Sequence, residues 1–342
     1  MDRAGSAVIG LAKLAVGPGN VALAERPERA PGPGEVAIEV RGAGVCGTDL
    51  HIEADEFAST PPVTMGHEVS GVVEELGDGV DPGWLGARVV SETYYSTCGA
   101  CEWCRRGRIN LCPERRSIGS FVDGAFARRV IVPARNLHRI PDWLEEHAAA
   151  LAEPLACVCH CLLEPPLAAP GDRVLVTGPG PVGLLAAQVG RASGGDVVVA
   201  GLPSDAQRLD AARELGLETV VAGGDVGECD LVIECSGSSG GATACLEAAR
   251  RGARYVQIGV FGRRVTVPLD RIFEKELVVT SGFASTPRSW RRAMMLIESR
   301  SIVLEPLVSE VASLSEWQRV FTDLREGRGI KVVFDPRKEA PA

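Results

Sequence analysis

The sequence lacks long apolar runs, low-complexity blocks and an excess of positive charge. A membrane-spanning helix needs about 18 or more consecutive apolar residues, and no run in this chain reaches that length. The 36 lysines and arginines are outnumbered by 45 aspartates and glutamates, which gives a net charge of −9. These absences argue against a membrane protein. They also argue against nucleic acid or an anionic membrane as the main partner.

A recognisable export signal is also missing. The first residues, MDRAGSAVIGLAKLAV, begin with charges but contain no long apolar segment and no convincing cleavage site, so we expect them to form a first strand. The 11 cysteines are an odd number, and without export we expect them to be reduced. These features predict a cytoplasmic protein, and 342 residues predict about two domains of roughly 100–200 residues each.

Four of the cysteines lie in one short stretch, TCGACEWCRRGRINLC (97–112). Their spacing is C-x₂-C-x₂-C-x₇-C, with mostly polar residues between them, which is unlike part of a hydrophobic core. Four thiolates can surround Zn²⁺ at about 2.3 Å per bond, and such a closed site is structural. The alternatives are two disulfides or free surface thiols. The spacing favours a structural zinc site, and its predicted ligands are Cys98, Cys101, Cys104 and Cys112.

Three other segments supply a mixed set of metal donors. GAGVCGTDLHIEAD contains Cys46, TMGHEVSGVVEELG contains the adjacent His67 and Glu68, and LAEPLACVCH contains Glu153. A thiolate, an imidazole and carboxylates are typical ligands of an open, catalytic zinc site. Taken alone, Cys46 would be a small buried hydrophobe and Glu153 an ordinary acid in the first turn of a helix. The neighbouring four-cysteine loop favours the metal interpretation.

A glycine-rich motif follows in RVLVTGPGPVGLLAAQVGRASGGDVVVAGL (173–202). A β-branched run over 174–177 leads into G-x-G-x-x-G, and an apolar helix and a second buried strand over 196–200 come next. This strand–turn–helix context is typical of dinucleotide binding, in which the glycines allow a tight turn and close approach of the pyrophosphate to the helix N-terminus. The predicted cofactor-binding residues here are Gly178, Gly180, Pro181, Val182 and Gly183.

Further strand-forming segments alternate with helical ones. They are CDLVIECSG (229–237), GARYVQIGVFG (252–262) and ELVVTSGF (276–283). Such alternation predicts an α/β fold with a doubly wound parallel sheet.

The motifs GVCGTDLH, GHEVSGVV, the four-cysteine loop, AEPLACV and TGPGPVGLL occur in an order that resembles the zinc-dependent medium-chain alcohol dehydrogenases. The chain looks closest to their sorbitol, threonine and polyol dehydrogenase branch, and the likeness extends to GRGIKVVFDP (327–336). It implies a GroES-like β-barrel catalytic domain over 1–150 and 302–342, with a structural zinc lobe over 95–113. It also implies a Rossmann NAD(P)-binding domain over 151–301 and an active site in the cleft between the two.

By this resemblance, Cys46, His67 and Glu153 match ligands of the catalytic zinc. Glu68 matches a neighbouring acid that binds zinc directly or through water. The four clustered cysteines match the structural zinc site, so two zinc ions per chain are implied. The implied reaction transfers a hydride between a secondary alcohol (a polyol, diol or amino alcohol) and NAD(P). The family forms dimers and tetramers, so a homodimer or homotetramer is expected.

The resemblance also implies a proton path from Thr48 to His51. Zinc acts as a Lewis acid that lowers the pKa of a bound alcohol, so oxidation must release a proton, and a hydroxyl and an imidazole three residues apart can carry it. The alternatives are a turn hydroxyl at Thr48 and a surface histidine at His51. The remaining histidines have no such context and are expected to be structural; they are His138, His147 and His160.

The residues after the second strand leave the choice of cofactor open. An NAD enzyme usually offers an acid to the ribose about 20 residues past the glycines. Here Gly201 and Leu202 occupy that zone, Asp205 comes later, and Arg208 is suitably placed for a 2′-phosphate. Asp205 could instead cap the next helix, and Arg208 could be solvated. The sequence therefore favours NAD and NADP almost equally, with a slight preference for NADP.

Other functions remain open on the sequence alone. A catalytically inactive zinc and dinucleotide sensor would keep the same fold, and a nucleic-acid zinc module would use the arginines of the four-cysteine loop, Arg105, Arg106 and Arg108. A zinc-free quinone reductase is disfavoured because it needs neither cysteine set. The substrate is not identified, although EADEFASTPPVT (53–64) and SGFAST (281–286) are expected near it. The acids Glu53, Asp55 and Glu56 could meet an amino alcohol, or they could belong to a solvated loop.

Overall fold

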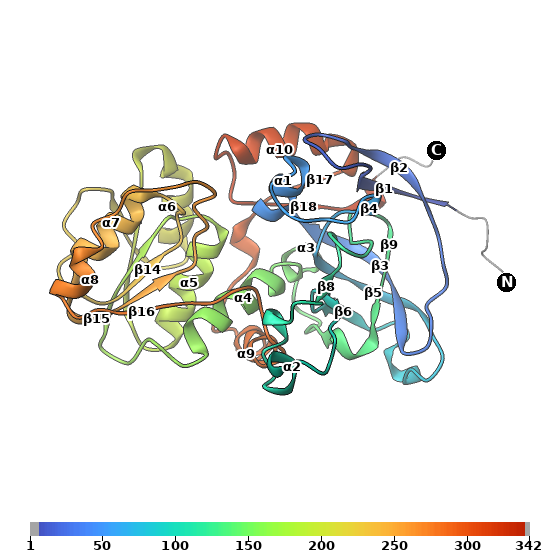
Figure 1. The fold of residues 1–342 in the computed structure, drawn as a ribbon, viewed down its shortest axis with the longest axis horizontal. Helices are drawn as coiled ribbons and strands as arrows, with labels where there is room; N and C mark the ends of the chain where they lie inside the picture. Colours follow the sequence, from blue (N-terminus) through green and yellow to red (C-terminus); the bar gives the residue numbers. More distant parts are fainter. Residues whose placement is uncertain (1–6, 339–342) are drawn as a thin grey trace. The chain divides into compact units, whose positions relative to one another are not determined.

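The computed structural model describes residues 7–338. Within them the chain forms two compact units, one running up to Glu153 and resuming at Val308, the other comprising Pro154–Leu307 (Figure 1). The outer limits predicted for the catalytic domain, residues 1–6 and 339–342, lie outside the described residues. Among the described residues, no helix is long and apolar enough to cross a membrane.

The first unit is built mainly from antiparallel strands. Its larger sheet has the order β10-β6-β5-β3-β18-β17, with β9 also paired to β3, and a smaller sheet has the order β2-β1-β4. The strands are β1 (Ala7–Lys13), β2 (Val21–Pro27), β3 (Glu35–Gly44), β4 (Val63–Thr64), β5 (Glu68–Leu76), β6 (Arg88–Ser91), β7 (Tyr94–Ser96), β8 (Arg116–Ser117), β9 (Arg129–Pro133), β10 (Leu137–Arg139), β17 (Val308–Ala312) and β18 (Lys331–Phe334). The expected first strand is thus found as β1, from Ala7 onward.

The core of this unit lies between the sheets. Apolar residues at alternate positions, such as Val36, Ile38 and Val40 on β3, are fully buried, as period-two strands require. Phe126 and Phe334 meet edge to face at 5.1 Å between ring centroids. Because β18 pairs antiparallel with the end of β3, the C-terminal strand is fixed beside the segment that leads into Cys46.

Helices in the first unit are short. They are α1 (Gly47–Glu53), α2 (Glu102–Arg105), α3 (Glu146–Ala149) and α10 (Trp317–Arg325). The helix α1 begins directly after Cys46, whose backbone N–H donates to Asp49 at 2.9 Å. This bond satisfies an N–H at the helix start. The side chains at positions 46–51 are therefore held by one turn of backbone.

The second unit is a parallel sheet of order β13-β12-β11-β14-β15-β16. Its strands are β11 (Arg173–Thr177), β12 (Asp196–Gly201), β13 (Glu218–Val221), β14 (Cys229–Glu234), β15 (Ala249–Gln257) and β16 (Val278–Ser281). Its helices are α5 (Pro181–Ala192), α6 (Ala206–Glu214), α7 (Ser239–Ala248), α8 (Asp270–Glu274) and α9 (Pro287–Glu298), and α4 (Ala152–Leu163) crosses the boundary between the units in sequence. The predicted doubly wound α/β architecture is confirmed (Figure 1).

Candidate functional site

Cys46, His67 and Glu68 form one buried group in the first unit. Each offers a ligand atom, and these atoms all lie within 4.8 Å of one another. Cys46 precedes α1, His67 lies in the loop before β5, and Glu68 is the first residue of β5. The side chain of Glu68 is fully buried and His67 is 9% exposed. A thiolate, an imidazole and a carboxylate so close together are the donors of an open zinc site.

The contacts of Glu68 show that this group fits a metal ion. Its Oε1 accepts a hydrogen bond from Lys331 at 2.7 Å, while its Oε2 is buried and has no hydrogen-bond partner. A side chain at Gly44 would meet that oxygen at 2.0 Å, so glycine keeps the space around it clear. A buried carboxylate oxygen normally has a partner, and a cation at the donor group would supply one.

Negative charge at these donors favours the cationic forms of Lys331 and of His67 itself. Burial opposes the charge on Lys331, but the negative charges of Glu68 and Cys46 outweigh it and raise its pKa. Burial likewise opposes the charge on His67, but the negative charge of Asp49 outweighs it and raises the pKa of His67 well above its ordinary value. The donor group thus carries an excess of negative charge, which suits a divalent cation.

Asp49 lies beside the imidazole of His67. Its Oδ1 lies 3.7 Å from His67 Nδ1, and its side chain is fully buried. At this distance the two groups form an ion pair and no hydrogen bond, because Asp49 Oδ1 has no hydrogen-bond partner. The Thr48 hydroxyl lies 3.8 Å from the Cys46 sulfur, at the edge of the same group.

Glu153 is not brought into the group that meets the 4.8 Å criterion. It lies in the first turn of α4, is 6% exposed, and accepts a hydrogen bond from the Thr93 hydroxyl at 3.0 Å. Its charge nevertheless contributes to the raised pKa of Lys331, so it lies near the other donors. Its role as a ligand stays a prediction.

The histidines outside this group all face carboxylates. His51 Nδ1 lies 2.7 Å from Glu56 Oε2, at the partly exposed end of α1. The other three histidines also contact carboxylates: His138 contacts Glu92, His147 contacts Glu145 and Asp335, and His160 contacts Glu164.

The three acids considered as partners for an amino alcohol already have partners of their own. Glu53 pairs with Arg325, Asp55 with Lys13, and Glu56 with His51. They therefore belong to local ion pairs, which weakens the hypothesis that they recognise an amine.

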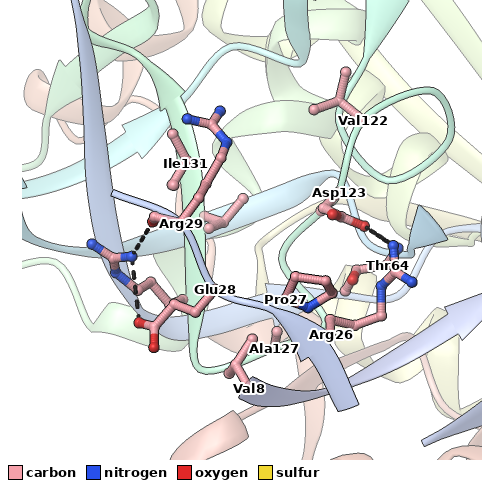
Figure 2. A pocket seen from close by; sticks show the side chains of 13 residues that line it. Val8, Arg26, Pro27, Glu28, Arg29, Thr64, Val122, Asp123, Ala127 and Ile131 are labelled. Atoms are coloured by element: carbon pink, nitrogen blue, oxygen red, sulfur yellow. Dashed lines mark hydrogen bonds and ion pairs between the residues drawn. The ribbon is translucent and has the colours of Figure 1, made fainter. Parts of the chain in front are cut away.

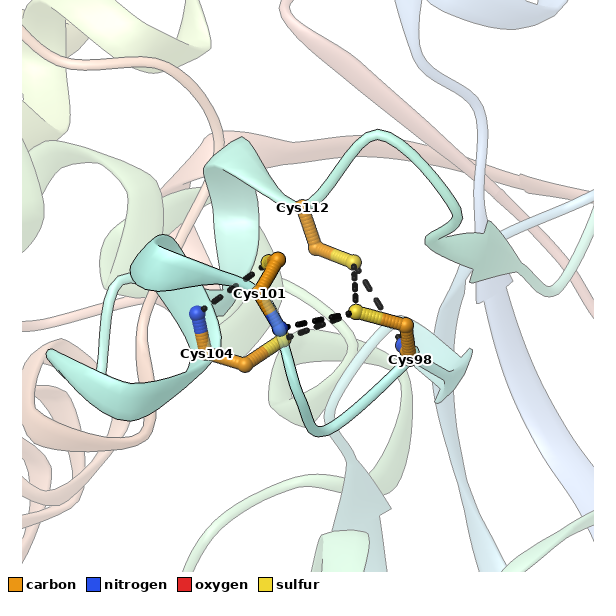
Figure 3. Close-up of side chains that lie close together, drawn as sticks. All are labelled: Cys98, Cys101, Cys104 and Cys112. Atoms are coloured by element: carbon orange, nitrogen blue, oxygen red, sulfur yellow. Dashed lines mark hydrogen bonds between the residues drawn. The ribbon is translucent and has the colours of Figure 1, made fainter.

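The four cysteines of the predicted structural site lie together (Figure 3). The Cys98 sulfur is 3.6 Å from that of Cys112 and 3.9 Å from that of Cys104, which is too far for a disulfide bond of about 2.05 Å. Hydrogen bonds from the backbone N–H groups of Ala100 and Cys101 lower the pKa of Cys98 to about 7. A thiol that ionises readily is a good zinc donor. All 11 cysteines of the chain are free, as expected.

A cavity of about 700 Å³ lies in the second unit at the glycine motif. Gly178 has φ +91°, and a Cβ on Gly183 would lie 1.9 Å from the Gly178 carbonyl oxygen, so both positions need glycine. A Cβ on Gly180 would meet no atom within 4 Å, so its backbone is open to a ligand. Gly178 and Gly180 line the cavity, and α5 begins at Pro181 beside them. This is the geometry of a pyrophosphate-binding turn.

Leu202 and Arg208 also line this cavity. Asp205 accepts a hydrogen bond from the Leu202 backbone N–H at 2.9 Å, and Arg208 Nη1 lies 3.4 Å from Asp205 Oδ1. These contacts bear on the two alternatives, a helix-capping Asp205 and a solvated Arg208. Asp205 precedes α6, but its carboxylate bonds to Leu202 and Arg208 and caps no N–H of that helix, while Arg208 is largely buried.

Sequence reasoning missed part of the cavity wall. The end of β13 and the segment that follows it, together 220–227, line the cavity, and so does the segment after β14, with Cys235, Ser236 and Ser238. The signal was available, because ligands of parallel α/β sheets bind at the carboxyl ends of strands, and ECSG stands at the end of one.

A second cavity, of about 270 Å³, lies in the first unit between β2 and β9 (Figure 2). Its arginines already face acids. Arg129 contacts Glu28, Glu74 and Glu75, and Arg26 contacts Asp123. These ion pairs leave no excess of charge of one sign, so this cavity indicates no ligand class.

The chain is similar to known dehydrogenases along its length. The family described as alcohol dehydrogenase GroES-like domain matches residues 32–142, and the family described as zinc-binding dehydrogenase matches residues 181–299. A sorbitol dehydrogenase from Halalkalibacterium halodurans is 37% identical over 95% of this chain and 98% of its own length. An L-threonine 3-dehydrogenase from Thermococcus kodakarensis is 34% identical over 90% of this chain and 92% of its own.

Solved structures agree with the sequence relatives. A zinc-binding dehydrogenase from Sinorhizobium meliloti bound to NADP has a TM-score of 0.87 and 33% identity, over 97% of this chain and 100% of that chain. The relatives are dehydrogenases, which supports an enzyme rather than the inactive sensor. The chain therefore belongs to the zinc-dependent medium-chain alcohol dehydrogenase family, in its sorbitol, polyol and threonine dehydrogenase branch, and is an NAD(P)-dependent oxidoreductase of alcohols.

Proposed function

We propose that this enzyme oxidises a polyol or another secondary diol by hydride transfer to NADP or NAD at the Cys46, His67 and Glu68 group. The observation that carries this proposal is the buried, unpartnered Oε2 of Glu68 beside a thiol and an imidazole. Zinc held there by these residues, with Glu153 nearby, would act as a Lewis acid that lowers the pKa of the alcohol. The pairing of Glu53, Asp55 and Glu56 with basic residues favours a diol over an amino alcohol.

In this proposal the residues of α1 carry the proton. The Thr48 hydroxyl, next to Cys46, accepts the proton of the alcohol, and His51 passes it toward water at its partly exposed position. Glu56 holds His51 Nδ1, which leaves Nε2 as the acceptor.

The four-cysteine group binds a second, structural zinc ion, which gives two per chain. This is supported by the convergence of all four sulfurs and by the two donor groups being separate. The second unit binds the cofactor, with a slight preference for NADP. Arg208 in the cavity wall and the absence of an acid at Gly201 and Leu202 support that preference, while Asp205 opposes it.

We also propose a cytoplasmic homodimer or homotetramer. Eleven free cysteines suit a reducing compartment. The terminal strand β16 of the parallel sheet exposes Val278 and Val279, which supports assembly through that edge.

The test is an activity screen of polyols, diols and amino alcohols with NAD⁺ and with NADP⁺, together with zinc analysis of protein purified without chelators. The expected result is turnover of a diol or polyol and two zinc ions per chain. Cys46→Ser should keep one zinc ion and lose turnover. Arg208→Ala should weaken the binding of NADP⁺ more than the binding of NAD⁺, by about 1–3 kcal/mol. Wild-type protein with zinc and bound cofactor but no turnover on any alcohol would instead support the sensor.

A further inference from the structure

A carboxylate without a counter-ion is buried at the end of β14. Glu234 is the last residue of that strand and is 0% exposed. The cofactor cavity is lined by the residues that follow it, Cys235, Ser236 and Ser238. Across residues 7–338, no arginine, lysine or histidine forms an ion pair with it. Fully buried acids are usually paired with a cation or bound to a metal, so this one needs another explanation.

The carboxylate is held entirely by hydrogen-bond donors. Its Oε1 accepts from the backbone N–H of Ser236 at 2.8 Å and from the Ser236 hydroxyl. Its Oε2 accepts from the Gly237 N–H at 3.1 Å and from the Gln257 side-chain amide at 2.7 Å. Four donors and no acceptor form the hydrogen-bonding environment of an ionised carboxylate. Glu234 is therefore a buried negative charge.

The same residue joins two loops at the carboxyl end of the sheet. Its backbone carbonyl accepts from the N–H groups of Ile258 and Gly259, which follow β15, while its side chain holds the loop after β14. There is no free space around these bonds. A Cβ on Gly259 would lie 2.4 Å from Glu234 Oε2, and a Cβ on Gly178 would lie 2.6 Å from the Ser236 Cα. The carboxylate is thus linked by direct packing to the first glycine of the pyrophosphate turn.

The charge of Glu234 acts differently on the two forms of the cofactor. The oxidised nicotinamide ring carries one positive charge that the reduced ring lacks, and both forms have the same phosphates. Glu234 lies directly behind the cavity wall, next to the lining residue Cys235. A buried negative charge there stabilises the oxidised form relative to the reduced form. We propose that Glu234 is a positioning residue of the cofactor cavity whose buried charge favours binding of the oxidised cofactor. This rests on the assignment of the cavity to NAD(P).

The test compares the dissociation constants of the oxidised and reduced cofactor by calorimetry, without alcohol, in the zinc-loaded enzyme. Wild type, Glu234→Gln and Glu234→Asp are measured with whichever of NAD and NADP binds more tightly. In Glu234→Gln the oxidised form should lose affinity relative to the reduced form by roughly ten- to twentyfold, as expected for unit charges about 10 Å apart at an effective dielectric constant of about 20. Glu234→Asp keeps the charge, so its ratio should match wild type even where both affinities fall.

Gln188→Leu is the matched control. Gln188 is also fully buried in the second unit and bonds to the N–H and carbonyl of Val303 at 2.8 and 3.0 Å, and it is not among the residues that line the cavity. Its loss should lower thermal stability and leave the ratio of the two dissociation constants unchanged. If Glu234 had a purely structural role, Glu234→Gln would show this same pattern, a lower stability with an unchanged ratio.

A second variant covers the case in which Glu234→Gln does not fold. Gln257→Lys keeps a donor to Glu234 Oε2 and neutralises its charge, so the ratio should change in the same direction. An unchanged ratio in a folded Glu234→Gln or Gln257→Lys protein would overturn the proposal. Wild-type protein that binds neither cofactor would overturn the assignment of the cavity as well, and the two failures are thereby distinguished.

Discussion

The pairing of His51 with Glu56 assigns a testable role to each of them. We predict that His51→Gln lowers kcat/KM for alcohol oxidation near neutral pH by about 10²-fold, the lower end for loss of a proton-transfer group. The loss should shrink at alkaline pH, because hydroxide and buffer can then accept the proton directly. Glu56→Gln should cost less, since it removes only the group that orients the imidazole.

The measurement is the pH profile of kcat/KM for both variants, with a deuterated alcohol to identify the hydride step. His138→Gln is the control, because His138 also faces a carboxylate, Glu92, at 3.0 Å, but lies on β10 and not on α1. If His51→Gln follows the wild-type profile at every pH, the relay assignment is wrong and His51 is a surface histidine.

The residues of the candidate site could be predicted because their chemistry is local. Cys46, His67 and the four clustered cysteines are recognised by residue type and spacing, which the sequence displays directly. Their partners could not be predicted in the same way. Lys331, which bonds to Glu68, is 263 positions away along the chain, and only the pairing of β18 with β3 brings it there. Glu234 was missed because nothing in the letters ECSG shows that its four partners are all donors.

Among the elements, the segment over 97–112 has little regular structure to hold it. It contains only the four-residue α2 and a three-residue 3₁₀ helix, Ile109–Leu111, and helices so short are not stable alone. We predict that Cys104→Ser loses the structural zinc ion and destabilises the first unit, because metal binding there is coupled to folding. A loss of about 2 kcal/mol would lower the melting temperature by roughly 5 °C.

Zinc analysis and thermal unfolding of the same samples check this. Cys157→Ser is the control, since Cys157 is also partly exposed but lies on α4, outside both donor groups. It should keep two zinc ions and a melting temperature close to that of wild type. A Cys104→Ser protein that keeps two zinc ions would refute a four-cysteine site.

Asp335 directly follows β18, and its carboxylate makes the stability of the fold depend on pH. Burial opposes the charge on this carboxylate, but hydrogen bonds from Arg337 and His147 outweigh it and lower its pKa to about 2. The unfolded value is about 3.9, so the stabilisation is complete above pH 4 and is lost between about pH 4 and pH 2. We predict that Asp335→Asn costs about 1 kcal/mol at pH 7, after discounting for solvent screening.

Denaturant unfolding of both proteins at pH 7, pH 4 and pH 2.5 measures the difference. The gap between wild type and Asp335→Asn should be similar at pH 7 and pH 4 and smaller at pH 2.5. A gap of constant size over this range would mean that the carboxylate charge contributes nothing and that only packing is lost.

The elements of the second unit were easier to predict than those of the first. Runs of β-branched residues next to glycine turns identify β11 and β12, each of which is one residue longer than the predicted 174–177 and 196–200. The predicted segment 276–283 contains the shorter β16, Val278–Ser281. In the first unit, β17 and β18 join a sheet formed mainly by residues before 140, and this long-range pairing leaves no mark in local periodicity.

At the scale of the whole molecule, the two edges of the parallel sheet differ in their protection. The edge strand β13 carries Glu218, which pairs with Arg173, and charge on an edge strand discourages pairing with another chain. The opposite edge strand, β16, has the sequence VVTS, and its Val278 and Val279 are 58% and 48% exposed. A second copy of the chain could pair with β16 about a two-fold axis and cover these valines.

We therefore predict that Val279→Lys converts the assembled protein to monomers, because a lysine at this edge would place two like charges at the two-fold contact. The measurement is the molar mass by light scattering after gel filtration, over a range of protein concentrations. Val221→Lys is the control, since Val221 is 45% exposed on the opposite edge strand β13 and should leave the mass unchanged. A wild-type monomer, or a Val279→Lys protein with the mass of the wild-type assembly, would exclude β16 as the contact that holds the copies together.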